Sequence, residues 1–150
     1  MELRKMESSD LPQFEIWLSK PHVKLWYHEP QDWIMEIEDQ DKTFSFIHHY
    51  MVICNNKPIG FCQYYACENS DEKWDVDSDK AYSIDYMIGE ENYLKKGHGK
   101  RIILELINMI KKHKDAKRII VKPEKENVSS CKALLSCGFI CEKDTYILEL

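Results

Sequence analysis

The residues best suited to handle an anion lie at 93–101, which reads YLKKGHGKR. Two glycines stand one residue apart, and four basic residues surround them: Lys95, Lys96, Lys100 and Arg101. Glycine lets the backbone approach an anion closely and take a positive φ. Unpaired N–H groups at a helix start add partial positive charge. If a helix begins here, Gly97 and Gly99 predict a phosphate-binding turn.

The elements around this turn have the required order. Residues 82–90, YSIDYMIGE, alternate like a strand, and residues 102–114, IILELINMIKKHK, have the period of a helix. Three phosphate loops are then compared. A P-loop requires G-x-x-x-x-G-K-[ST], but Lys100 is followed by Arg101. A dinucleotide fingerprint requires a third glycine at position 102, which is isoleucine. The third is a pyrophosphate loop with the pattern Q/R-x-x-G-x-G/A.

The rest of the chain predicts an α+β fold. Strands are expected at 2–6, 44–54, 58–66, 81–89, 118–123, 139–143 and 145–150. Helices are expected at 9–20 (capped by Ser9), 30–37, 102–114 and 127–138. This mixed order predicts a largely antiparallel sheet flanked by helices, with a parallel crossover from the fourth strand through a helix to the fifth. Asn55 and Asn56 predict the turn of a hairpin because asparagine tolerates positive φ.

Length and composition limit the possibilities further. The chain has 150 residues, which predicts a single domain over 1–150. No apolar run approaches the ~20 residues of a membrane span, and the first residues have no apolar signal segment, so we expect a cytoplasmic protein that does not bind membranes. The six cysteines and six histidines show no metal-ligand spacing, so no metal is expected. A formal charge of −5 and no aromatic–basic RNA motif argue against a nucleic-acid partner.

The charges are unevenly distributed along the chain. Residues 68–80, ENSDEKWDVDSDK, contain six acids and two lysines, whereas basic residues cluster at 95–101 and 111–118. Such blocks are either solvated surface or two poles, one for an anion and one for a cation.

Four stretches in order along the chain resemble the GNAT superfamily of acetyl-CoA-dependent N-acetyltransferases, and within it the aminoglycoside 6'-N-acetyltransferase branch. They are LSKPHVKLWYHEP (18–30), NNKPIGFCQYYA (55–66), SIDYMIGEENYLKKGHGKR (83–101) and KPEKENVSSCKALLSCGF (122–139). LKKGHG matches the family's Q/R-x-x-G-x-G/A loop at both glycines, with Leu94 in place of Gln or Arg. The resemblance implies a GNAT-like sheet and acetyl-CoA as cofactor.

The resemblance also implies which residues hold the cofactor. The fourth and fifth strands are expected to splay apart around the pantetheine arm. The backbone of Met87, Ile88 and Gly89 would pair with pantetheine, and Asn127 would contact the cofactor from the next helix start. The pyrophosphate would be held by the loop residues Lys95, Lys96, Gly97, His98, Gly99 and Lys100.

Two residues carry the implied chemistry. Asp85 matches the acidic residue of the branch on the fourth strand, where it would take a proton from the acceptor ammonium or orient that ammonium by charge. An aspartate with a pKa near ~3.9 is a poor base, so a proton-accepting role requires burial to raise the pKa. The N–H of Met87 would stabilise the developing oxyanion. Leu134 occupies the position where many relatives have a tyrosine that protonates the leaving thiolate, so no general acid is predicted.

The acceptor side is expected to combine acids with aromatic rings. The candidate substrate-binding residues are Trp26, Tyr27, Gln63, Tyr65, Glu72, Trp74, Asp75 and Asp85. Core packing is the alternative explanation for each aromatic ring. Lys122 departs from the branch, which usually has an aspartate there that binds the drug's amines. A cation at that position should repel a polyamine.

The leading hypothesis is transfer of acetyl to a primary amine of a cationic small molecule, an aminoglycoside 6'-amine above all. The first alternative keeps the chemistry but changes the acceptor to a polyamine, a hydroxamate precursor or a protein amine. The second is a non-catalytic CoA-binding sensor. The sequence is compatible with either a monomer or a homodimer.

Overall fold

A computed structural model describes residues 1–150. The seven strands are β1 (Glu2–Lys5), β2 (Ile47–Cys54), β3 (Lys57–Ala66), β4 (Ala81–Ile88), β5 (Arg118–Val121), β6 (Ile140–Glu142) and β7 (Thr145–Glu149). The five α-helices are α1 (Leu11–Ser19), α2 (Pro21–Lys24), α3 (Pro30–Glu38), α4 (His98–Lys111) and α5 (Val128–Ser136). None of these helices is both long and apolar enough to cross a membrane.

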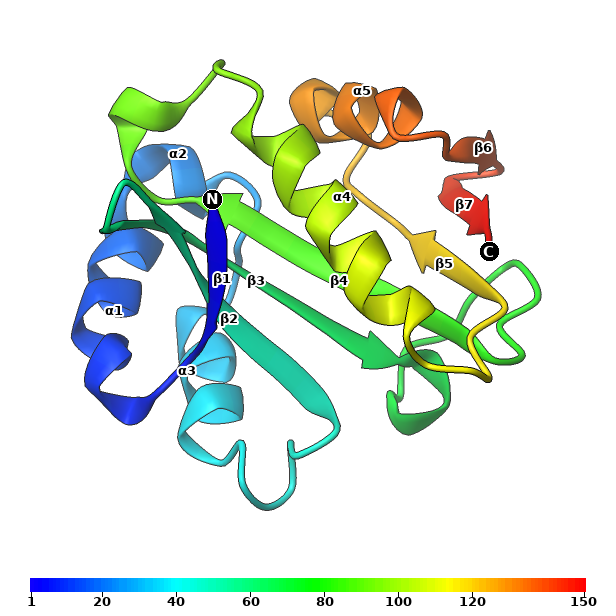
Figure 1. Ribbon diagram of the computed structural model, residues 1–150, viewed down its shortest axis with the longest axis horizontal. Helices are drawn as coiled ribbons and strands as arrows, with labels where there is room; N and C mark the ends of the chain where they lie inside the picture. Colours follow the sequence, from blue (N-terminus) through cyan, green and yellow to red (C-terminus); the bar gives the residue numbers. More distant parts are fainter. The chain divides into compact units, whose positions relative to one another are not determined.

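The strands form one mixed sheet in the order β1-β2-β3-β4-β5-β7-β6. β1 pairs antiparallel with β2, β5 with β7, and β6 with β7, whereas β4 and β5 run parallel. The connection between this parallel pair contains α4 (Figure 1). The predicted α+β fold, its largely antiparallel sheet and its single parallel crossover are therefore confirmed.

The chain divides into two compact units. The first contains Met1–Gln63 and Tyr86–His98, and the second contains Tyr64–Asp85 and Gly99–Leu150. β3 and β4 each contribute residues to both units.

The core of the first unit lies between the helices α1 and α3 and the strands. Phe14 of α1 and Trp33 of α3 both contact the Phe61 ring of β3, with centroids 4.7 and 6.5 Å away. Trp17 and Met51 are fully buried in the same cluster. These helices therefore bury aromatic residues that recur at helical spacing, as their sequences predict.

The core of the second unit is built around α4 and the strands β5 and β7. α4 buries one apolar stripe: Ile102, Ile103, Leu106, Ile107 and Ile110. Just after the end of α4, the His113 ring packs against Tyr82 of β4. His113 Nε2 also shares a hydrogen bond of 3.0 Å with the Tyr64 hydroxyl.

Local signals placed most elements correctly. Asn55 and Asn56 take φ values of 51° and 64° and form the predicted hairpin turn. Ser9 does not cap α1, because it lies inside a short 3-10 turn, Ser8–Asp10, that Glu7 and Asp10 close as a reciprocal capping box. The connector after Pro21 contains the short helix α2, which the sequence did not predict.

Candidate functional site

The end of β4 is packed tightly against α1 in the first unit. A Cβ atom at Gly89 would clash with the Trp17 ring, so only glycine fits there. The Trp17 indole N–H donates to Glu90 at 2.6 Å, and Lys20 and Lys57 approach the same carboxylate at 3.7 and 3.6 Å. The Trp17 hydrogen bond and these cations lower the pKa of Glu90. The segment that leads into the glycine turn is therefore fixed by the helix that precedes it.

Gly89→Ala is expected to destabilise the protein by about 1–3 kcal/mol, the usual cost of overpacking a buried site. Trp17 is fully buried and cannot move aside without displacing its neighbours. The free energy of unfolding, measured in urea, tests this. Val128→Ala, at an exposed position, provides a control that should change it little. A Gly89→Ala protein as stable as the wild type would show that the Trp17 contact is not tight.

The glycine turn offers an open backbone surface. Lys95 and Gly97 take positive φ values of 58° and 81°, and α4 begins at His98. At Gly99, the second residue of α4, a Cβ atom would meet nothing within 4 Å. Neither packing nor φ explains a glycine at this position, because a helix favours alanine over glycine. A ligand pressed against the backbone does explain it, so the turn fits the pyrophosphate of the predicted cofactor.

Cations and an aromatic ring flank the turn within the first unit. Lys95 and Lys96 are exposed. Lys57 and Lys96 lie over the Tyr93 ring, 5.9 and 6.0 Å from its centroid. The Tyr93 ring in turn contacts His98 with centroids 5.6 Å apart. The next residues, Lys100 and Arg101, are exposed on the first turn of α4, so the positive charge predicted for this turn is present at its surface.

The parallel ladder between β4 and β5 is short. It consists of the pairs Ala81 with Arg118 and Tyr82 with Ile119, although β4 runs on to Ile88. Beyond this ladder β5 continues its pairing with β7 through Val121. The early end of the ladder is the feature expected of two strands that splay apart.

Asn127 lies at the start of α5 in the second unit. Its side-chain oxygen accepts a hydrogen bond from the Ser130 backbone N–H at 3.3 Å and so caps the helix. A contact with the cofactor would then use the amide NH₂ of Asn127. That contact stays a prediction.

A buried tyrosine in the second unit is influenced by two carboxylates. Tyr65 is 8% exposed, and its hydroxyl donates to Glu72 at 3.4 Å. Burial, and then the negative charges of Asp85 and Glu72, raise the pKa of Tyr65, so its hydroxyl stays protonated. Ser83, buried on β4, also hydrogen-bonds to Tyr65. Asp85 itself is half-buried. The structure thus brings together three predicted acceptor-side residues, Tyr65, Glu72 and Asp85.

Three other acids of the loop lie beside cations of the protein. Asp75 approaches Lys122 at 3.8 Å, Asp77 approaches Arg118 at 3.2 Å, and Asp79 approaches Lys117 at 3.4 Å. The Asp79 backbone N–H, followed by Arg118, lowers the pKa of Asp77. Lys122, the residue that departs from the aminoglycoside branch, is therefore the partner of the predicted acceptor residue Asp75. No sequence signal indicated this pairing.

The predicted aromatic residues divide by burial. Trp74 is half-buried and packs on the second-unit core of Cys67, Ala81, Ile120 and Ile147. Tyr27 packs on the first-unit core and contacts Trp33 with centroids 4.6 Å apart. Trp26 is half-buried. These positions give Trp74 and Tyr27 a packing role whether or not they also meet a substrate.

Gln63 lies in the first unit beside His49, and both side chains are 2% exposed. Burial lowers the pKa of His49 to about 4, so its imidazole is neutral at neutral pH. A Gln63 side chain that reached a substrate would have to do so from inside the core.

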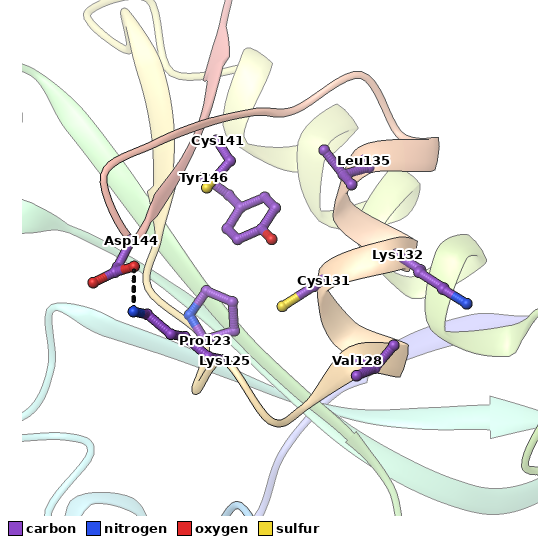
Figure 2. A pocket seen from close by; sticks show the side chains of 9 residues that line it. All are labelled: Pro123, Lys125, Val128, Cys131, Lys132, Leu135, Cys141, Asp144 and Tyr146. Carbon is purple, nitrogen blue, oxygen red and sulfur yellow. Dashed lines mark ion pairs between the residues drawn. The ribbon is translucent and has the colours of Figure 1, made fainter.

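A separate hollow of about 300 Å³ lies between α5 and the β6–β7 hairpin. Figure 2 shows Tyr146 inside it, with the Cys131 sulfur near the hydroxyl end of the ring and the Lys125–Asp144 ion pair at one side. The interaction with Cys131, followed by burial, raises the pKa of Tyr146. None of the predicted site residues lines this hollow.

Leu134 gives no proton donor. It is fully buried in α5. The absence of a general acid at that position stays a prediction.

An α+β protein whose parallel crossover helix begins at an open, basic glycine turn belongs to the class that binds a phosphorylated cofactor at a helix start. Residues 7–146 match the family model described as the acetyltransferase (GNAT) domain. The chain belongs to this family, and it is an acetyl-CoA-dependent N-acetyltransferase.

Relatives with this fold act on different acceptors. The chain is 23% identical over 145 residues to an aminoglycoside N(6')-acetyltransferase type 1 of Klebsiella pneumoniae, covering 91% of this chain and 72% of the relative. It superimposes with a TM-score of 0.83, at 20% identity, on an aminoglycoside acetyltransferase in complex with coenzyme A and kanamycin, covering 98% and 93% of the two chains. A ribosomal L7/L12 alpha-N-protein acetyltransferase in complex with coenzyme A gives 0.77 at 16% identity, covering 99% and 93%.

Proposed function

We propose that this enzyme transfers acetyl to a primary amine of a cationic small molecule. The observation that carries the proposal is the buried Tyr65, whose hydroxyl donates to Glu72 and which also feels the negative charge of Asp85. Two carboxylates near a neutral phenol form a site that favours a positive charge. An ammonium group bound there would lie against β4, the strand that leads into the cofactor turn.

In this proposal each residue has a separate task. When bound, acetyl-CoA supplies the acetyl group as a reactive thioester. The Lys95–Lys100 turn and the start of α4 hold its pyrophosphate. Asp85 orients the acceptor ammonium and receives its proton, directly or through water, so that the amine becomes nucleophilic. A backbone N–H of β4, that of Met87, stabilises negative charge that develops on the carbonyl oxygen.

The acceptor we favour is an aminoglycoside with a 6'-amine. The support is the activity of the aminoglycoside-acetylating relatives together with the acidic Tyr65 cluster. Lys122 does not neutralise the charge of this cluster, because its ammonium group lies against Asp75 instead. A protein amine is the second candidate, since a ribosomal-protein acetyltransferase has the same fold.

Release of free CoA thiol, followed against a panel of aminoglycosides, polyamines and peptides, tests the proposal. Turnover with kanamycin-type amines above the others is expected. Turnover on spermidine or peptides alone would show that the acceptor is a polyamine or a protein amine, not an aminoglycoside. Binding of acetyl-CoA without turnover on any amine would favour a sensor. We also propose that the enzyme works in the cytoplasm, since all six cysteines are free thiols.

The Michaelis constant for a polycationic acceptor is expected to rise with salt, because exposed charges are screened over ~8 Å at physiological ionic strength. Glu72→Gln should flatten this dependence, since Glu72 is exposed and its carboxylate meets the Tyr65 hydroxyl rather than one of the loop's ion-paired cations. Asp75→Asn is the matched control and should flatten it less, because an arriving cation must first displace Lys122 from Asp75. If the Michaelis constant depended equally on salt in all three proteins, the loop would be solvated surface without a role in acceptor binding.

A further inference from the structure

The peptide unit between Ile88 and Gly89 is held at both ends. Its N–H donates to the Ile59 carbonyl of β3 at 2.8 Å, and its C=O accepts a hydrogen bond from His22 Nε2 at 2.9 Å. The next N–H, that of Glu90, donates to the same Ile59 carbonyl at 3.1 Å. Two consecutive N–H groups on one carbonyl are the pattern of a bulge, where regular pairing ends.

This contact determines the proton position on His22. A carbonyl oxygen can only accept, so Nε2 must carry the hydrogen. The other ring nitrogen, Nδ1, is buried and has no partner in the protein. The side chain of His22 therefore makes one directed hydrogen bond, and that bond goes to the β4 backbone.

A peptide unit is planar, with its N–H and C=O pointing in opposite directions. Fixing both groups fixes the plane, and with it the ψ angle of Ile88 and the φ angle of Gly89. These angles set where the preceding backbone groups of Met87 and Ile88 point. At this bulge β3 holds only the N–H of the peptide unit, so the imidazole supplies the constraint on its C=O.

We propose that His22 is a positioning residue of the acetyl-transfer site, which holds the Ile88–Gly89 peptide so that the adjoining β4 backbone meets the cofactor in the productive direction. The inference rests on the proposed role of Met87–Gly89 in cofactor binding. It assigns a task to α2, which begins at Pro21 and anchors itself in the core through the buried Val23.

The test is the affinity for acetyl-CoA, measured by titration calorimetry, together with steady-state kinetics. His22→Leu should weaken acetyl-CoA binding and lower kcat/KM for acetyl-CoA by about tenfold, the equivalent of one hydrogen bond. The Michaelis constant for the acceptor should stay unchanged. Lys24→Ala, an exposed position on the same short helix, is the control for nonspecific effects and should match the wild type.

A pair of amide substitutions keeps the test decisive even where His22→Leu folds poorly. The glutamine amide nitrogen reaches about as far as Nε2, whereas that of asparagine reaches only as far as Nδ1. His22→Gln should therefore remain within about threefold of the wild type, and His22→Asn should lose about as much as His22→Leu.

Equal acetyl-CoA affinities in the glutamine, asparagine and wild-type proteins would overturn the role of His22 and leave the proposed function standing. A wild-type protein that does not bind acetyl-CoA would overturn both.

Discussion

Asp85→Asn is expected to lower kcat/KM for the acceptor amine by at least ~100-fold, because a positioned general base contributes ~100- to 10,000-fold. The substitution keeps the side-chain shape and removes the charge beside Tyr65. Acetyl-CoA affinity should hardly change, since the proposed cofactor contacts of Met87–Gly89 use backbone groups, which the substitution leaves in place. Steady-state kinetics together with calorimetry would measure both quantities.

The pH dependence separates two roles for Asp85. If it accepts the proton, raising the pH should partly rescue Asp85→Asn, because more of the amine is then neutral in solution. If it only anchors the ammonium, the loss should appear mainly in the Michaelis constant. Asp79→Asn, which removes an exposed carboxylate paired with Lys117, is the matched control. A loss below about threefold in both parameters for Asp85→Asn would show that Asp85 is neither base nor anchor.

Gly99→Ala is expected to change stability and cofactor affinity in opposite directions. Alanine in a helix is more favourable than glycine by about 0.5–1 kcal/mol, and nothing in the protein lies within 4 Å of the added carbon. The free energy of unfolding should therefore rise. The same carbon would meet a pyrophosphate held against the backbone, and a clash of ~1–3 kcal/mol weakens acetyl-CoA binding by about 10- to 100-fold.

Higher stability combined with weaker acetyl-CoA binding is expected only if the turn binds the ligand. A substitution at Gly97 would not separate the two effects, because its φ of 81° strains any other residue. Leu104→Ala, an exposed position on the same helix, is the control and should leave acetyl-CoA affinity unchanged. If the Gly99→Ala protein gained stability but bound acetyl-CoA as tightly as the wild type, the pyrophosphate would not bind at this turn.

The fold could be predicted because its signals are local. Alternation marked the strand at 82–90, helical spacing marked the helix at 102–114, and two asparagines marked the hairpin turn. The errors were also local: α2 is a single helical turn, too short to show a period, and the capping box of Glu7 and Asp10 placed a 3-10 turn where Ser9 was expected to cap α1.

The candidate site was less predictable because its contacts join distant residues. His22 and Ile88 are 66 positions apart, and Trp17 and Glu90 are 73 apart. The resemblance covered His22, Ile88 and Glu90 but not Trp17, and it did not predict either contact, whereas the structure shows both. Likewise the sequence predicts a repulsive charge at Lys122, since sequence alone cannot show that Asp75 lies against it.

The ion pairs of the acidic loop make this surface resemble an ion exchanger already loaded with its own counter-ions. Lys117, Arg118 and Lys122 are tethered to the sheet and occupy three of the loop's carboxylates. Each exposed pair is worth only about 0–1 kcal/mol, so an arriving cation can displace it. A loaded exchanger retains multivalent ions over monovalent ones, because a single multivalent ion replaces several tethered charges at once. The loop should therefore bind multivalent cations in preference to monovalent ones, whatever their shape.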